Sequence, residues 1–190
     1  MALPAKKECY TFADYLSWEG PERYELIDGE VFLLAAPSTV HQLVSGELYR
    51  QFANYLEGKK CLALSAPFDV RLFEKQGDRP EDVWTVVQPD ISVICDRDKL
   101  DERGCKGAPD LTLEILSPSS TRHDLLVKLN SYQKAGVREY WVVSPEDKTV
   151  NVFLLDGDAL VLRKVYGISD LAEVHILDGC YIELSKVFPS

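Results

Sequence analysis

Two acids, Asp90 and Glu114, are the residues of this chain whose type and position point most clearly to chemistry. Glu114 lies inside an apolar run over 111–116, where an ionised carboxylate seldom stays buried without a partner. If strands over 86–95 and 110–116 pair as an antiparallel hairpin, facing residue numbers sum to about 205, and Asp90 faces Glu114 or Ile115. Like charges on neighbouring strands are unfavourable unless a cation lies between them. The pattern therefore favours a cation site.

Lys128 is the third candidate, and it lies on the helix expected after the second strand. Residues 119–121 offer N-caps for a helix over 122–135, and a buried strand is expected over 138–144. The apolar stripe of this helix consists of Leu125, Leu129 and Tyr132. Lys128 lies at the edge of that stripe, two turns into the helix of a strand–helix–strand unit whose two strands should be parallel. In such a unit the end of the first strand, near Glu114, lies close to the start of the helix. The long side chain of Lys128 could therefore reach back toward Glu114.

The remaining elements are short strands and helices. The patterns predict a helix over 11–18, a hairpin over 24–35, a helix from 38 or 39 to 57, strands over 61–65 and 68–73, loops over 74–82 and 96–109, a hairpin of strands 149–155 and 159–166, and a turn within 174–182. The apolar stripe of the long helix is expected to be Leu43, Leu48, Phe52 and Tyr55 or Leu56. We find no catalytic pattern after residue 145.

Length and composition limit the class of protein. A chain of 190 residues with 46% hydrophobic residues can bury one core, so we expect a single domain over 1–190. The net charge of −10 argues against a protein that mainly coats nucleic acid, although residues 59–138 carry 13 basic and 13 acidic side chains. The five cysteines form no C-x-x-C pair, which argues against a disulfide framework or zinc site and favours a reducing cytoplasm. No segment is long and apolar enough to span a membrane.

Four segments together resemble a known family. They are YELIDGEV (24–31), His41-Gln42, VQPDISV (87–93) and APDLTLEILSPSSTRHDLLVKLNSYQKAGVREYWVVSP (108–145). They are similar to the Uma-type endonucleases of the PD-(D/E)XK restriction-endonuclease-like superfamily, over nearly the whole chain and most specifically over 86–145. The resemblance implies an α/β (mixed α+β) fold, in which a central mixed β-sheet is flanked by helices and carries additional N- and C-terminal β-hairpins.

The resemblance also implies roles for individual residues. Asp90 and Glu114 would hold a divalent metal, Mg²⁺ or Mn²⁺, with the backbone carbonyl of Ile115 as a further ligand. Leu116 stands where the superfamily usually has lysine, and the family pattern supplies Lys128 from the following helix instead. His41 would contact phosphate or hydrogen-bond a metal ligand. DNA would be the substrate, and the endonuclease would act as a homodimer. We expect the protein in the cytoplasm, with no membrane association and no small-molecule cofactor.

Each candidate also has a structural interpretation. Asp90 could cap a strand entry, Glu114 could pair with Arg122 or Lys128, and Lys128 could be an ordinary solvated lysine. His41 could pack near the helix N-cap, and solvation explains Glu25 and Glu30 nearly as well as a role at the site does. Asp110 is assigned to strand entry, because it lies about 13 Å along the strand from Glu114.

Two alternative functions remain open from the sequence. The first is a weak or inactive nuclease-fold protein that serves as a binding or assembly module, which the missing strand lysine and the acidic net charge favour. The second is an accessory factor that needs a partner for targeting, because the chain has no helix-turn-helix or zinc-finger pattern.

Overall fold

The computed structural model describes residues 8–117 and 122–189, with the side chains of 122–124 left out. The helices are α1 (Phe12–Tyr15), α2 (Thr39–Leu56), α3 (Arg122–Ala135) and α4 (Leu184–Val187), with 3₁₀ turns at Pro80–Asp82 and Arg97–Lys99. The strands are β1 (Arg23–Ile27), β2 (Glu30–Leu34), β3 (Leu62–Ser65), β4 (Val70–Arg71), β5 (Ile91–Ile94), β6 (Leu100–Asp101), β7 (Gly104–Lys106), β8 (Leu111–Ile115), β9 (Glu139–Ser144), β10 (Thr149–Asp156), β11 (Ala159–Gly167), β12 (Leu171–Glu173) and β13 (Tyr181–Glu183).

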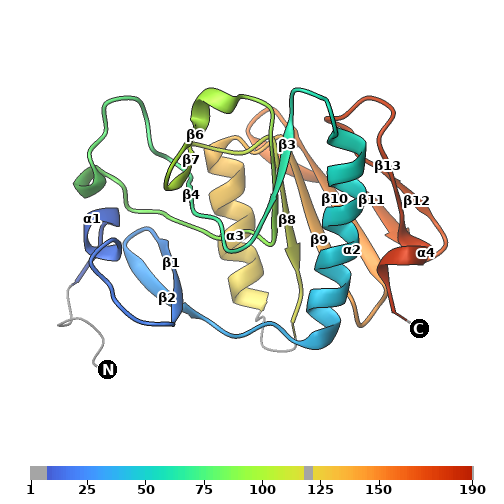
Figure 1. The fold of residues 1–190 in the computed structure, drawn as a ribbon, viewed down its shortest axis with the longest axis horizontal. Helices are drawn as coiled ribbons and strands as arrows, with labels where there is room; N and C mark the ends of the chain where they lie inside the picture. Colours follow the sequence, from blue (N-terminus) through green and yellow to red (C-terminus); the bar gives the residue numbers. More distant parts are fainter. Residues whose placement is uncertain (1–7, 118–121, 190) are drawn as a thin grey trace.

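A mixed six-stranded sheet forms the centre of the molecule, in the order β11-β10-β9-β8-β5-β3 (Figure 1). Strands β8 and β9 are parallel, as the strand–helix–strand pattern predicts, and the other neighbours are antiparallel. The predicted hairpin of 149–155 and 159–166 is present as β10 and β11. It extends this sheet, because β10 pairs with β9.

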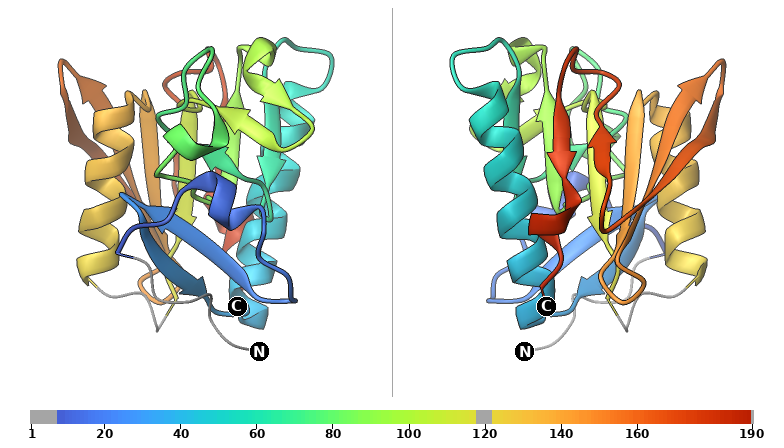
Figure 2. Two further views of the ribbon diagram at one scale, coloured as in Figure 1. Left: turned by 90° about the vertical axis from the view of Figure 1, so that its left-hand side faces the viewer. Right: turned by 90° about the vertical axis from the view of Figure 1, so that its right-hand side faces the viewer.

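The two long helices lie on opposite faces of this sheet (Figure 2). Helix α2 buries Val44, Leu48, Phe52 and Leu56 against one face. On the other face, Tyr132 of α3 is fully buried, with Leu125 and Leu129 packed around the same core. The stripe predicted for α3 is therefore confirmed. The one predicted for α2 is wrong at Leu43, whose side chain is exposed, and Val44 takes its place.

Several predicted elements differ in extent. The helix expected over 11–18 is shortened to the single turn of α1, and the strand expected over 86–95 is regular only in β5. Val86 and Val87 form isolated bridges to Leu26 and Val70. The loop expected over 96–109 contains β6 and β7, which form a small separate sheet with β4. The N-caps predicted at 119–121 lie outside the described residues.

The interpretation of the cysteines requires a correction. Cys61 and Cys95 form a disulfide, while Cys9, Cys105 and Cys180 are free. The register pairs Leu62 with Ile94, so the two joined cysteines extend the β3–β5 ladder by one position. An odd cysteine count did not exclude one bridge between neighbouring strands. The cysteines therefore do not support the prediction of a reducing compartment. No helix in the described part of the chain is long and apolar enough to cross a membrane.

Candidate active site

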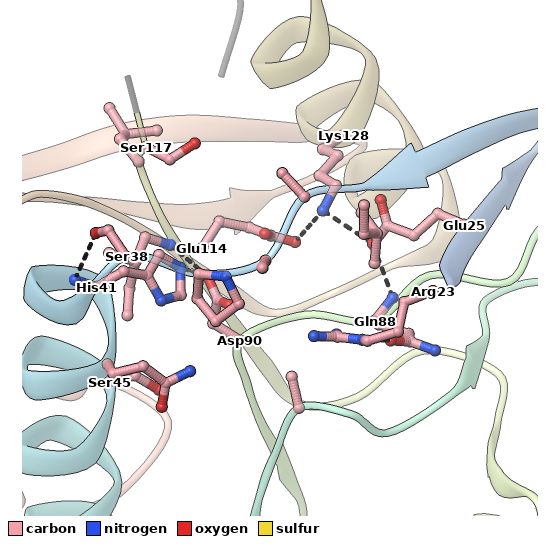
Figure 3. Close-up of a pocket in the computed structure, with 18 of the residues that line it drawn as sticks. Arg23, Glu25, Ser38, His41, Ser45, Gln88, Asp90, Glu114, Ser117 and Lys128 are labelled. Carbon is pink, nitrogen blue, oxygen red and sulfur yellow. Dashed lines mark hydrogen bonds and ion pairs between the residues drawn. The ribbon is translucent and has the colours of Figure 1, made fainter. Parts of the chain in front are cut away.

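Glu114 lies near the end of β8 on the face covered by α3, and only 8% of the residue is exposed. Two side chains of α3 hold its carboxylate, and Figure 3 shows the first of them, Lys128. Nζ of Lys128 lies 2.9 Å from Oε1 of Glu114, and the hydroxyl of Tyr132 donates a hydrogen bond to the same oxygen. The helix stripe predicted Tyr132 as an apolar core residue, but its hydroxyl also serves the site. A buried acid thus has two partners on one helix, spaced by one helical turn.

Asp90 immediately precedes β5 and lies opposite Glu114. The register Ile91–Leu113 continues to this pair, which confirms the expected facing of the two acids. Oδ2 of Asp90 accepts a hydrogen bond of 2.8 Å from the backbone N–H of Ile115, so Asp90 ties the start of β5 to the end of β8. The same oxygen lies 3.2 Å from Nε2 of His41 on α2. The carboxylate of Asp90 is therefore fixed from two sides.

Lys128 reaches the site as the sequence predicts, but it contacts a further acid there. Its Nζ lies 3.0 Å from Oε1 of Glu25 on β1, in addition to its contact with Glu114. Glu25 is 2% exposed, and its Oε1 also accepts a hydrogen bond from the backbone N–H of Gln88. From the sequence, Glu25 was predicted to lie outside the core site. The signal that could have found it was the one used for Glu114, an acid flanked by apolar residues inside a strand.

Of the other candidate residues, His41 belongs to the site, whereas Glu30 and Asp110 lie outside it. The backbone N–H of His41 donates to Oγ of the N-cap Ser38 while its ring contacts Asp90, so His41 takes part both in the helix cap and in the site. Glu30 is exposed at the hairpin turn. Asp110 accepts a hydrogen bond from the backbone N–H of Cys95 and pairs with Arg138, contacts that agree with the strand-entry role assigned to it.

Burial and neighbouring charges perturb the ionisation of this cluster. Burial raises the pKa of Glu114 to about 7, with the negative charges of Asp90 and Glu25 adding to the rise and Lys128 and Tyr132 opposing it. Burial alone would lower the pKa of Lys128, but Glu114 and Glu25 outweigh it and hold that pKa above its usual value. The hydrogen bond to Asp90 raises the pKa of His41 despite partial burial. Lys128 is therefore a cation at neutral pH.

Glu25, His41, Asp90, Glu114 and Lys128 all line one cavity of about 640 Å³ (Figure 3). Strand β2 and the segment that follows it contribute mainly apolar lining residues, and the first half of α2 contributes mainly polar ones. Ile115 also lines the cavity, and the role of its carbonyl as a metal ligand stays a prediction.

The donor set suits a hard cation. Oδ1 of Asp90 and Oε2 of Glu114 receive no hydrogen bond from any residue that the structure describes, while the second oxygen of each carboxylate is firmly held. Among the side chains that the structure describes, those of residues 8–117 and 125–189, no set of three or more acids, histidines or cysteines could hold a metal. Mg²⁺ commonly binds through only one or two carboxylates and takes its other ligands from water and substrate phosphate. Two free carboxylate oxygens are compatible with that mode.

The fold is shared with a solved nuclease-like structure. That structure is described as a "putative nuclease belonging to DUF820" from Anabaena variabilis ATCC 29413. The TM-score is 0.73 at 21% sequence identity, over 94% of this chain and 97% of that one. At this identity the likeness shows the fold alone, and the class of fold is mixed α+β.

The sequence comparisons place the chain within that class. It is 29% identical over 167 residues to the "Uncharacterized protein slr1290" of Synechocystis sp. (strain ATCC 27184 / PCC 6803 / Kazusa), covering 85% of this chain and 82% of the relative. The Uma2 family, described as "Putative restriction endonuclease", matches residues 12–184. The chain belongs to this family, as the sequence motifs predicted. Family and fold together support a nuclease-type function.

Proposed function

We propose that this protein is a divalent-metal-dependent endonuclease that hydrolyses phosphodiester bonds in DNA. One observation carries the proposal. Asp90 and Glu114 lie opposite each other on neighbouring strands, and Lys128 contacts Glu114 within the same cavity. Two acids and a lysine in this arrangement match the requirements of phosphodiester hydrolysis, which needs a bound hard cation and extra positive charge near the phosphoryl group.

Asp90 and Glu114 would hold the metal through their free oxygens, with the carbonyl of Ile115 as a further ligand. When bound, Mg²⁺ or Mn²⁺ would stabilise charge on the phosphoryl group and make a water molecule more acidic. The N–H of Ile115 and the ring of His41 orient Asp90, and Tyr132 and Lys128 orient Glu114. Because the supporting groups use only one oxygen of each carboxylate, they preorganise the site without blocking it.

Lys128 would stabilise the transition state as a cation. An ammonium group has three N–H donors, and the carboxylates of Glu114 and Glu25 take two of them. The third remains for a phosphate oxygen or the attacking water. Since the two acids keep its pKa high, Lys128 does not remove a proton from water at neutral pH. That proton passes to the surrounding solvent or to another group.

The test is nicking of supercoiled plasmid in Mg²⁺ or Mn²⁺. We expect Asp90→Asn and Glu114→Gln to lower the nicking rate at least 100-fold, and Lys128→Met to lower it by a similar factor, since each removes a charge needed in the transition state. Asp110→Asn is the matched control, because it removes a carboxylate from the segment entering the same strand without touching the cavity.

The comparison among the variants decides the outcome. Wild type and Asp110→Asn should nick alike, and EDTA should stop both. If all five proteins nick at one rate, the activity comes from a contaminant and the proposal is wrong. Size-exclusion chromatography with light scattering would test the accompanying proposal of a homodimer, which follows from the need to cut two strands.

A second candidate is a nuclease-fold protein that has lost activity and serves as a binding module. The observation in its favour is that Lys128 is already paired with two buried acids, so this ionic cluster can hold β1, β8 and α3 together without a metal. On this view, Lys128→Met lowers thermal stability and changes no enzymatic rate. The nicking assay separates the two candidates.

A further inference from the structure

Arg23 is a cavity residue that the metal-site proposal does not use. It begins β1, two residues before Glu25, and both side chains line the cavity with Ile27 because alternate residues of a strand share a face. Its guanidinium lies beside Gln88 (Figure 3). Nε and Nη2 of Arg23 donate hydrogen bonds of 2.8 and 2.7 Å to Oε1 of Gln88. The N-terminal hairpin therefore brings a half-buried cation to the site.

The amide of Gln88 is held in one orientation. Its Nε2 donates to Oδ1 of Asp69 at 2.8 Å and to the hydroxyl of Tyr15 at 3.0 Å. The Tyr15 hydroxyl in turn donates to the same oxygen of Asp69. Because both donors of the amide are engaged on that side, its carbonyl oxygen is directed at Arg23. Tyr15, Asp69 and Gln88 are distant from one another in sequence, and together they fix the position of Arg23.

The partner of Arg23 is a neutral amide, and this distinguishes Arg23 from the other basic side chains of the cavity. Lys128 is paired with two carboxylates and His41 with one. No acid within the described ranges lies at ion-pair distance from Arg23, whose side chain is held by an amide oxygen alone. An amide fixes the guanidinium but leaves its positive charge uncompensated. A carboxylate at Gln88 would have neutralised that charge and competed with any anion.

We propose that Arg23 binds a backbone phosphate of the nucleic-acid substrate within the cavity, and that Gln88 is its positioning residue. The inference rests on the proposed nuclease function and adds a substrate-binding group to it. A guanidinium has five N–H donors, of which Gln88 engages two, so a fork of donors remains for phosphate oxygens. The uncompensated charge of Arg23 attracts the phosphate. Because the Gln88 amide already fixes the guanidinium, the Arg23 side chain loses less conformational entropy when phosphate binds.

The test is the salt dependence of oligonucleotide binding, measured by fluorescence anisotropy in Ca²⁺ without cleavage. We expect Arg23→Gln to weaken the binding of a labelled single-stranded or duplex oligonucleotide roughly tenfold. We also expect it to reduce the slope of log affinity against log salt by about one, as for loss of one phosphate contact. Arg23→Lys should keep the slope but bind more weakly, because lysine lacks the fork.

Two further variants make the test specific. Gln88→Glu should reduce the slope by about one with Arg23 intact, because the new carboxylate neutralises the guanidinium. Arg50→Gln is the control, since Arg50 is an exposed arginine paired with Glu47 on α2 and should leave binding unchanged. Thermal melts would check that each variant is folded, and Arg23→Gln keeps the test valid if Gln88→Glu does not fold.

The outcomes separate the two proposals. The assignment of Arg23 is wrong if Arg23→Gln leaves the salt slope unchanged, or if Arg50→Gln lowers the affinity and slope as much as Arg23→Gln does. Either result leaves the nuclease proposal standing if wild type still nicks plasmid in an Asp90-dependent way. If wild type binds oligonucleotide with the Arg23-dependent slope but never cleaves, Arg23 is confirmed as a phosphate contact and the nuclease proposal is wrong.

Discussion

A carboxylate buried inside a strand needs a hydrogen-bonding or charged partner, and at the scale of single residues this requirement identified the site. It led to Glu114, and the pairing of the strands then led to Asp90. The same requirement applies to Glu25, which is more buried than Glu114 and contacts the same lysine. The prediction left Glu25 outside the core site because this residue flanks an Asp-Gly turn, where solvation explains an acid nearly as well. Burial in this case comes from contacts with α3 and Gln88, which are distant in sequence.

The structure predicts that Glu25 positions Lys128. In Glu25→Gln, the amide oxygen can still accept from the N–H of Gln88, but the charge that holds the ammonium is lost. We expect the plasmid-nicking rate to fall about tenfold, equivalent to about 1.4 kcal/mol in activation free energy, while substrate affinity changes little. Steady-state kinetics would measure both quantities.

Glu30→Gln provides the comparison for this variant. Glu30 lies on the same hairpin, but it is exposed and should tolerate the change. Equal rates for Glu25→Gln and wild type would show that Glu114 alone positions Lys128. A loss of rate that both variants share would show an effect of net charge instead.

At the scale of the elements, local patterns located the helices and long strands well. Helix α3 has the predicted bounds, and the predicted pairing of β5 with β8 is correct, with a register one residue from the estimate. These successes rest on caps and periodicity, which act within a few residues. The small sheet of β4, β6 and β7 was missed because β4 and β7 pair in parallel across a long sequence separation, and strands of two or three residues carry no readable period.

Gly104 shows why that small sheet matters to the site. Its φ is +121°, and a Cβ at this position would lie 2.0 Å from the carbonyl oxygen of Asp69. The next N–H, that of Cys105, donates to the same carbonyl. This close approach places Asp69, which orients Gln88 and through it Arg23. A glycine is therefore required at position 104 by both backbone conformation and space.

Gly104→Ala should destabilise the protein strongly. We expect a loss of about 3 kcal/mol, which corresponds to roughly 6–12 °C in melting temperature for a chain of this size. Gly46→Ala in α2 is the control, because its Cβ would meet nothing within 4 Å and alanine favours a helix by about 0.5–1 kcal/mol. Thermal melts would show opposite shifts. Equal melting temperatures for the two variants would contradict the packing described for Gly104.

At the scale of the whole molecule, the site joins distant parts of the chain. Strand β1, the start of β5, the end of β8, and helices α2 and α3 each contribute a side chain to one cavity. The net charge of −10 makes a metal and the few cavity cations the main attraction for phosphate. The sequence indicated Asp90, Glu114 and Lys128, and the same pattern could have indicated Glu25, but it could not indicate Arg23 or Gln88. Their roles depend on how the N-terminal hairpin docks on the sheet, which no local pattern encodes.

Thermal unfolding in increasing Mn²⁺ tests the central claim, that Asp90 and Glu114 hold one divalent cation between two strands. A ligand that binds only the folded state stabilises it by about 2.7 kcal/mol at 100 times its dissociation constant, or roughly 5–10 °C here. We predict this shift for wild type and for Asp110→Asn, and no shift for Asp90→Asn or Glu114→Gln. No shift in wild type at millimolar metal, or the same shift in all four proteins, would contradict the account.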